Sequence, residues 1–284
     1  MLATTRATRP EAIAEAAARR RRRPLLGNEG RLLIVAADHP ARGALRVRDR
    51  ELAMADRREL LERLLTALGR PGVDGVLGTA DVLEDLLLLG ELDYKIVIGS
   101  MNRGGIPGSA FEIDDRFTGY DAASIAAAGF DGGKMLLRID PTDPATASTL
   151  QACSQAVSEL AERRLMAMIE PFWVRRESAG TRNDLEPANM IRAVAVGQGL
   201  GHTSAYTWLK LPPTRDMEQV VAASTLPTLV LGGDPTGRWE ETYALWRKAL
   251  RLPTVRGLVV GRALLYPDDG DVAAAVDAAV ALLD

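Results

Sequence analysis

The sequence predicts an α/β fold, a single TIM (β/α)8 barrel with an extra helix at the amino terminus. Eight short apolar runs alternate with eight helical patterns along the 284 residues. The runs are almost continuously hydrophobic, which is typical of parallel strands covered on both faces. Eight such units in about 250 residues match the size of a TIM barrel.

A doubly wound open sheet is the main alternative. A Rossmann-type sheet would carry G-x-G-x-x-G after its first strand. Here the first apolar run ends in Asp38, His39 and Pro40 instead, which favours the barrel. No low-complexity linker separates two parts of the chain. We therefore expect one domain over residues 1–284, with residues 1–30 as a helical extension.

The apolar runs and the helical spacing of leucine and alanine define the expected elements. The expected strands are residues 31–37, 74–78, 95–99, 132–139, 165–170, 207–211, 228–231 and 257–260. The expected helices are residues 9–18, then 48–68, 81–89, 120–128, 143–163, 187–198, 215–223, 238–250 and 271–283.

Composition narrows the class of protein. The formal charge of −3 gives no support for a nucleic-acid or membrane partner, and no apolar run approaches the roughly 18 residues of a membrane span. Cys153 is the sole cysteine, so no internal disulfide can form. We expect a cytoplasmic homo-oligomer. Arg19 to Arg23 are five consecutive arginines, which we interpret as a solvated helix leading into the fold.

In a TIM barrel the chemistry takes place at the carboxyl ends of the strands. Charged and polar residues follow several of the expected strands. In chain order they are Asp38, His39, Asn102, Arg103, Lys134, Arg138, Glu170 and Lys210, with Gly232, Gly233, Gly261 and Arg262 at the last two strands.

The lysines are unusual in number and place. Of 35 basic residues only four are lysine, and two of these, Lys134 and Lys210, lie in apolar strands. Arginine cannot form a Schiff base, whereas a desolvated lysine amine can. The alternative is a snorkelling or ion-paired lysine at a strand end.

Carbon–carbon bond cleavage through an imine would use this set of residues. Lys210 would attack a substrate ketone, with Lys134 as the second cation that favours a neutral amine. Glu170 would move protons during imine formation, and Asp38 would deprotonate the hydroxyl that becomes the aldehyde. Asp38 as a turn residue and Glu170 as a salt-bridge partner remain open alternatives.

The ordered motifs resemble class I aldolases over nearly the whole chain. They are Asp38-His39, the Gly-Gly-Lys134 run through Arg138, Ile-Glu170-Pro and Leu-Lys210-Leu-Pro. The chain is similar to tagatose-bisphosphate aldolases and to bacterial and archaeal fructose-bisphosphate aldolases. The resemblance implies that Lys210 forms the Schiff base, with Glu170 and Lys134 as its helpers. It also implies that no cofactor is needed.

Two departures bear on the substrate. Pro40 stands where archaeal-type members tend to have glycine, and residues 229–233 lack the second lysine of deoxyribose-phosphate aldolase. The sequence is most similar to an actinobacterial aldolase-like subgroup associated with inositol catabolism. That resemblance implies 2-deoxy-5-keto-gluconate 6-phosphate as substrate, with dihydroxyacetone phosphate and malonate semialdehyde as products.

The two ends of the expected substrate, a phosphorylated ketose or keto acid, match different residues. Gly232, Gly233, Gly261 and Arg262 fit a TIM-barrel phosphate site, because glycines permit close backbone approach and arginine adds charge-assisted hydrogen bonds. At the far end, Arg103 or Arg138 could bind a carboxylate or a second phosphate, and His39 could hydrogen-bond locally.

No His/Cys/Asp cluster has metal-site spacing, so we expect no metal. Two other functions stay open on the same barrel. One is a phosphosugar isomerase or epimerase with Glu170 as base, and the other is a non-catalytic barrel that binds a sugar phosphate.

Overall fold

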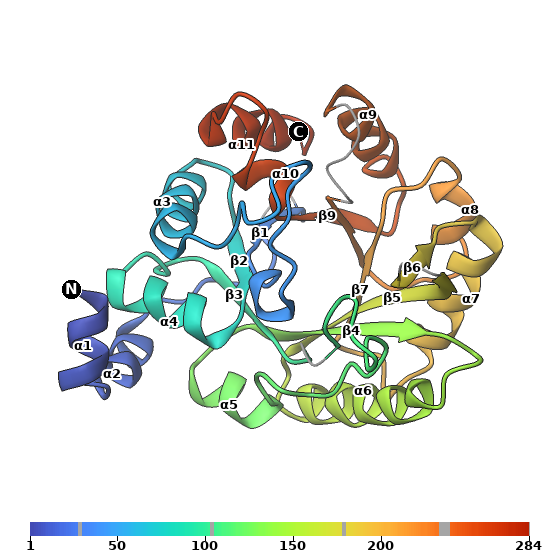
Figure 1. Ribbon diagram of the computed structural model, residues 1–284, viewed down its shortest axis with the longest axis horizontal. Coiled ribbons are helices and arrows are strands. Elements are labelled where there is room, and N and C mark those ends of the chain that lie inside the picture. Colours follow the sequence, from blue (N-terminus) through green and yellow to red (C-terminus); the bar gives the residue numbers. More distant parts are fainter. Residues whose placement is uncertain (28–29, 103–104, 178–179, 233–238, 284) are drawn as a thin grey trace.

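Eight parallel strands form a closed barrel in the computed structural model, which describes residues 1–27, 30–102, 105–177, 180–232 and 239–283 (Figure 1). Strand β1 pairs with both β2 and β9, and the β4–β5 pairing completes the ring. The predicted TIM barrel is therefore confirmed. In chain order the barrel strands are β1 (Leu32–Ala36), β2 (Gly75–Gly78), β3 (Ile96–Ser100), β4 (Gly132–Ile139), β5 (Met166–Glu177), β7 (Thr207–Leu211), β8 (Thr228–Leu231) and β9 (Val255–Val260).

Helices follow the strands and surround the barrel (Figure 1). They are α3 (Arg57–Leu68), α4 (Ala80–Leu89), α5 (Ala122–Ala127), α6 (Ala145–Glu162), α7 (Pro187–Gln198), α8 (Met217–Val221), α9 (Trp239–Ala249) and α11 (Val272–Val280). Four short elements were not expected from the sequence: α1 (Leu2–Thr8), a 3-10 turn after β1 (Pro40–Arg42), β6 (Gly180–Asp184) and α10 (Arg262–Leu265).

Strand alternation sorts the apolar residues into two cores. One face of each strand packs inside the barrel, as Leu32, Ile34 and Met168 do, and the other face packs against the helices. The inward face continues to the carboxyl ends of the strands, where it carries polar residues. This alternation places Lys134 and Glu170 inside the barrel and not among the helices.

The prediction of a helix over 48–68 was wrong for its first half. Residues 48–56 form turns, in which Arg48 has a left-handed φ of 53° and Val47 and Arg50 form an isolated bridge. Helix α3 begins only after Asp56, whose side chain accepts hydrogen bonds from the backbone N–H groups of Arg58 and Glu59. The helix start is set by this N-cap.

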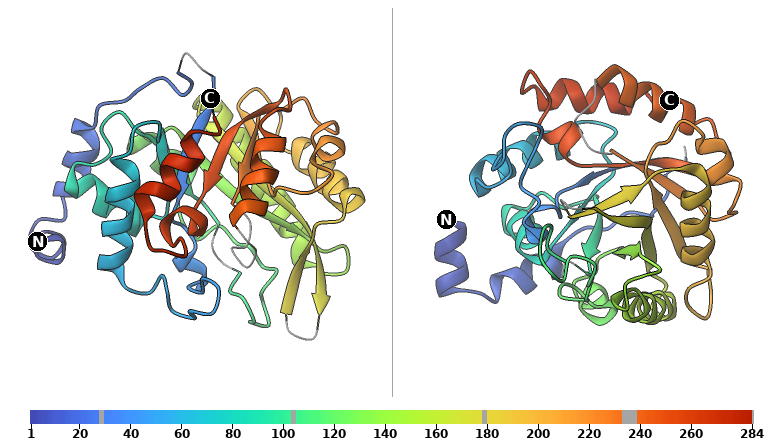
Figure 2. Two further views of the ribbon diagram at one scale, coloured as in Figure 1. Left: turned by 90° about the horizontal axis from the view of Figure 1, so that it is seen from above. Right: turned by 45° about the vertical axis from the view of Figure 1, so that its right-hand side comes forward.

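Strand β5 is longer than predicted. Its last residues leave the barrel and pair with the antiparallel strand β6 (Gly180–Asp184). The resulting hairpin projects from the end of the barrel where the segment between β3 and α5 also lies (Figure 2, left). Both features extend the wall around the carboxyl ends of the strands.

The amino-terminal helices α1 (Leu2–Thr8) and α2 (Ala12–Arg19) lie beside α4 (Figure 1). Arg6 binds Glu84 and Asp85 of α4 at 2.9 and 3.0 Å. In the described residues, no helix combines the length and the apolar character needed to span a membrane.

The interpretation of Arg19 to Arg23 as a solvated helix was wrong. Arg20 is 8% exposed, and its guanidinium donates to the backbone oxygen of Lys95 at 2.7 Å. Arg22 and Arg23 bind Asp131 and Asp74 at 3.1 and 2.6 Å. Because these carboxylates precede strands, the arginines attach the extension to the amino-terminal end of the barrel.

Candidate active site

Five strands bring one polar residue each into the barrel at its carboxyl end. They are Asp38 after β1, Ser100 on β3, Lys134 on β4, Glu170 on β5 and Lys210 on β7. Every one of them is buried, with exposed fractions between 0% for Ser100 and 8% for Glu170. Buried ionised groups are stable only when paired, so their mutual contacts decide what the site can do.

Glu170 lies between the two lysines. Its Oε1 is 3.1 Å from the Nζ of Lys210, and its Oε2 forms an ion pair with Lys134. The Nζ of Lys134 is also 3.3 Å from Oδ2 of Asp38, which accepts a 3.0 Å hydrogen bond from the hydroxyl of Ser100. The side chains form a continuous series from Lys210 through Glu170 and Lys134 to Asp38.

The two lysines determine the ionisation of Glu170. Burial favours the neutral acid and would raise the pKa of this carboxyl, but the charges of Lys134 and Lys210 outweigh burial and lower the pKa to about 2. Glu170 is therefore an anion at neutral pH. With both lysines protonated, it is also a very weak base.

Ser100 was missed by the sequence analysis, although its position held a signal. It lies one residue beyond the expected strand 95–99, on the face that the barrel rule marks as functional. Asn102 was noted but given no role. Its side chain donates to the backbone oxygen of Leu136 and accepts from the same residue's N–H, at 2.6 and 2.7 Å. Asn102 thus ties the segment after β3 to β4.

The residues expected to bind phosphate lie at the ends of β8 and β9. A side chain at Gly261 would place its Cβ 2.4 Å from the backbone oxygen of Ala36 and 2.8 Å from the His39 ring. At Gly232 the Cβ would meet Val260 at 2.8 Å. Glycine is therefore required at both positions for packing. Arg262 begins α10 and donates to the backbone oxygen of Arg46 at 3.5 Å. Gly233 lies outside the described residues.

Arg138, His39 and Arg103 were expected to bind the far end of the substrate. Arg138 is 5% exposed and makes a bidentate pair with Asp115, with both N–O distances 2.7 Å. Its charge is thus already engaged by a carboxylate of the protein. The Nδ1 of His39 is 3.9 Å from Asp38, beyond hydrogen-bond distance. Arg103 lies outside the described residues.

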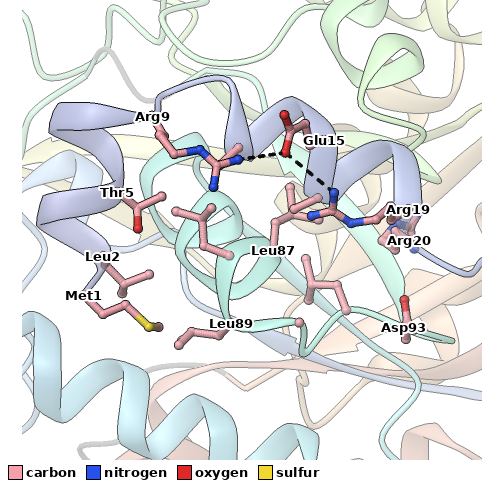
Figure 3. A pocket seen from close by; sticks show the side chains of 15 residues that line it. Met1, Leu2, Thr5, Arg9, Glu15, Arg19, Arg20, Leu87, Leu89 and Asp93 are labelled. Atoms are coloured by element: carbon pink, nitrogen blue, oxygen red, sulfur yellow. Dashed lines mark hydrogen bonds and ion pairs between the residues drawn. The ribbon is translucent and has the colours of Figure 1, made fainter.

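Two surface cavities lie away from the strand ends. One, of about 430 Å³, lies between α1, α2 and α4, where Glu15 pairs with Arg9 and Arg19 (Figure 3). The other, of about 560 Å³, lies between α9 and α11. Neither contains the buried lysines. Among the described residues, no group of three or more His, Cys, Asp or Glu side chains is placed to hold a metal ion.

The solved structures that are similar to this chain include a near relative and more distant ones. Cgl0159 from Corynebacterium glutamicum (Brevibacterium flavum) is 55% identical, with a TM-score of 0.97 over 99% of this chain and 95% of that one. An archaeal fructose 1,6-bisphosphate aldolase is 17% identical, with a TM-score of 0.67 over 95% and 98% of the two chains. A Schiff base forming fructose-1,6-bisphosphate aldolase is 16% identical, with a TM-score of 0.69 over 96% and 100%.

These distant likenesses show the fold. Among curated protein sequences no match was found. The family model described as Cgl0159-like matches residues 30–280, which include every residue of the buried series. The chain therefore belongs to the Cgl0159-like family.

Proposed function

We propose that this protein is a class I aldolase that cleaves a phosphorylated ketose or keto acid through a Schiff base on Lys210. The observation that carries the proposal is the buried Lys134–Glu170–Lys210 arrangement at the carboxyl end of the barrel. Two lysines held on one carboxylate provide a nucleophilic amine, a permanent cation and a proton carrier in one place.

The contacts support different roles for the two lysines. Lys134 has two carboxylate partners, Asp38 and Glu170, so its positive charge is doubly stabilised. In the described part of the chain Lys210 has Glu170 as its carboxylate partner. Because Lys134 is held by two carboxylates and Lys210 by one, we assign Lys134 as the cation and Lys210 as the nucleophile.

The reaction follows from these positions. The neutral amine of Lys210 attacks the ketone carbon and gives a carbinolamine. Glu170, 3.1 Å from Nζ, holds the proton that the Lys210 ammonium gave up and passes it to the carbinolamine hydroxyl, and water leaves to give the iminium ion. While the Lys210 nitrogen is neutral, between loss of its proton and formation of the iminium ion, one of the two charges that lower the pKa of Glu170 is absent. Glu170 then becomes a stronger base.

Bond cleavage uses the other end of the series. Asp38 takes the proton from the substrate hydroxyl, the carbon–carbon bond breaks, and an aldehyde departs. The electron pair moves into the iminium ion and leaves an enamine on Lys210. Protonation of the enamine carbon and hydrolysis then release dihydroxyacetone phosphate and free Lys210.

The comparisons support this chemistry at the level of fold. In one archaeal fructose-1,6-bisphosphate aldolase, with a TM-score of 0.68 and 17% identity, the catalytic lysine is covalently bound to the carbinolamine intermediate. We place the phosphate of the substrate beside Gly232, Gly261 and Arg262. The specific substrate that we propose is 2-deoxy-5-keto-gluconate 6-phosphate.

An isomerase or epimerase on the same barrel would need Glu170 as its base. A carboxylate with a pKa of about 2 is poorly suited to remove a proton from carbon. In the aldolase Glu170 acts beside a neutral Lys210 nitrogen, where one of the two lysine charges is absent, so this ionisation weighs less against the aldolase than against the isomerase.

The proposal is tested by release of dihydroxyacetone phosphate from a panel of phosphorylated ketoses and keto acids. Lys210→Arg keeps a positive charge but has no nucleophilic amine, so we expect no cleavage of any member of the panel. The matched control is Lys95→Arg, because the Lys95 amine donates to the backbone oxygen of Val73, away from the buried series. Wild-type cleavage by Lys210→Arg would disprove the proposal.

A further inference from the structure

Ser100 has no step in the proposed reaction, although it is fully buried beside the residues that do. It ends β3, and the two inward residues before it, Ile96 and Ile98, belong to the apolar core inside the barrel. Its register partner on β4 is Lys134. The change from isoleucine to serine therefore occurs at the level of the buried lysines. Because a buried hydroxyl is stable when it is hydrogen-bonded, the role of Ser100 depends on its contact with Asp38.

The hydroxyl of Ser100 reaches Asp38 across β2, the strand that pairs with both β1 and β3. Strand β2 ends at Gly78, which has no side chain. The hydroxyl of the next residue, Thr79, is directed to Oδ1 of Asp81 at 2.6 Å. The Ser100 hydroxyl donates to Oδ2 of Asp38 at 3.0 Å. The end of β2 thus allows a direct contact between residues from β3 and from the end of β1.

The backbone around Ser100 is fixed on both sides. Its carbonyl oxygen accepts a hydrogen bond from the N–H of Tyr120 at 3.2 Å, and the N–H of Met101 donates to the backbone oxygen of Lys134 at 2.9 Å. Rotation about a single side-chain bond then decides where the hydroxyl oxygen lies. Ser100 can therefore hold Asp38 in a defined position relative to β4.

Lys134 also contacts Oδ2 of Asp38, but the two donors differ. The Nζ of Lys134 lies 3.3 Å from Oδ2, against 3.0 Å for the Ser100 hydroxyl, and it is shared with Glu170. An ammonium ion has only donors, whereas a hydroxyl can donate to a carboxylate and accept from a carboxylic acid. Ser100 can therefore keep its contact when Asp38 takes a proton, which the proposed cleavage requires.

We infer that Ser100 is a positioning residue for carbon–carbon cleavage. Its hydroxyl fixes the rotation of the Asp38 carboxylate, and with it the direction in which Asp38 takes the proton of the substrate hydroxyl. This inference rests on the proposed function. In the described part of the chain, the side chain of Ser100 hydrogen-bonds to Asp38 and to neither Lys210 nor Glu170. Imine formation on Lys210 should therefore not depend on Ser100.

Ser100→Ala tests this division, because it removes the hydroxyl and adds no atom to the core. The substrate is 2-deoxy-5-keto-gluconate 6-phosphate, or the panel member that the wild type cleaves fastest. We expect kcat to fall about tenfold or more and KM to change by less than about threefold. The borohydride-reduced adduct formed on Lys210 with dihydroxyacetone phosphate should reach the wild-type amount. An unchanged kcat would overturn the inference, and so would equal losses of cleavage and adduct, which would assign Ser100 a structural role.

A double-mutant cycle tests whether Ser100 acts through Asp38. Ser100→Ala should cause no further loss of single-turnover cleavage in a protein that already carries Asp38→Ala. The same fold loss in both backgrounds would rule out action through Asp38. The matched control is Thr228→Val, which removes a hydroxyl that is also buried but donates to the backbone oxygen of Leu226 at the amino-terminal end of β8. We expect this control to keep the wild-type kcat.

Failure of this inference can be told from failure of the proposed function. A wild-type protein that forms the adduct and cleaves the substrate, together with a Ser100→Ala variant of equal kcat, would overturn the role of Ser100 alone. A wild-type protein that forms no adduct and cleaves no member of the panel would refute the aldolase itself.

Discussion

Lys210 is buried in an apolar strand because its amine faces Glu170 and not because the strand tolerates a charge. The ion pair at 3.1 Å compensates part of the loss of hydration. Glu170 in turn is the centre of the site, since it joins Lys210 to Lys134. Its ionisation therefore has a measurable effect on stability.

The lowered pKa of Glu170 predicts an acid-sensitive contribution to folding. The pKa of a glutamate in an unfolded chain is 4.5, and the pKa of Glu170 in the folded protein is about 2. The stabilisation from this group is therefore fully present at pH values above 4.5 and is lost as the pH falls toward 2. Between pH 6 and pH 3 the wild type should lose about 2 kcal/mol of unfolding free energy through this group.

Urea unfolding at several pH values checks this prediction. Glu170→Gln should lack this part of the pH dependence, although it should be less stable than the wild type at pH 6 because two buried lysines lose their shared anion. Glu62→Gln, at an exposed position of α3, should keep the wild-type pH dependence. If the unfolding free energies of Glu170→Gln and the wild type fell equally between pH 6 and pH 3, the assigned ionisation of Glu170 would be contradicted.

At the scale of elements, Arg20 is the most deeply buried of the described arginines that attach the amino-terminal extension to the rest of the protein. Arg20 donates to the backbone oxygen of Lys95 and lies 3.4 Å from Asp131. Its neighbour Arg19 is exposed and pairs with Glu15 at 3.7 Å. The same run of arginines thus contains an anchor and a solvated residue.

Arg20→Ala should lower the unfolding free energy by about 2–4 kcal/mol, because it removes the guanidinium donor from the backbone oxygens of Lys95 and Gly129 and one cation from Asp131. Arg19→Ala should change it by less than about 0.5 kcal/mol. Thermal and urea unfolding of the two variants measure the difference. Equal losses would show that the extension is not held by Arg20.

The end of β9 and α10 carries the proposed phosphate contact. Arg262→Ala should lower kcat/KM for phosphorylated substrates, because the lost contact is worth roughly 1.5–3 kcal/mol of binding free energy. The kcat/KM for unphosphorylated analogues should stay nearly unchanged. The control is Arg256→Ala, an exposed arginine at the start of the same strand. A similar loss on both substrate classes would assign Arg262 a structural role.

At the scale of the whole molecule, the barrel was predictable because parallel strands buried on both faces leave a direct hydrophobic signal. Strands β4, β7 and β8 were predicted with their observed bounds, 132–139, 207–211 and 228–231. Because lysine is rare in this sequence, the two lysines within predicted strands, Lys134 and Lys210, could be recognised as candidate site residues. Strand alternation then fixed their direction into the barrel.

The remaining features depend on contacts between distant segments. The β5–β6 hairpin forms outside the barrel, where exposed arginines hide the strand pattern. The partner of Arg138 is Asp115, in a segment without regular secondary structure, so the sequence could not show that this charge is already engaged. Residues 48–56 form turns because helix α3 is capped at Asp56 and because Ala53 and Met54 are buried in the core.

The most direct test of the account is chemical trapping of the Schiff base. The protein is incubated with dihydroxyacetone phosphate, reduced with borohydride, digested and mapped by mass spectrometry. The proposed mechanism predicts an irreversible adduct on Lys210 and an unmodified Lys134. An adduct on Lys134, or continued cleavage of a ketose phosphate with no adduct on any lysine, would contradict it.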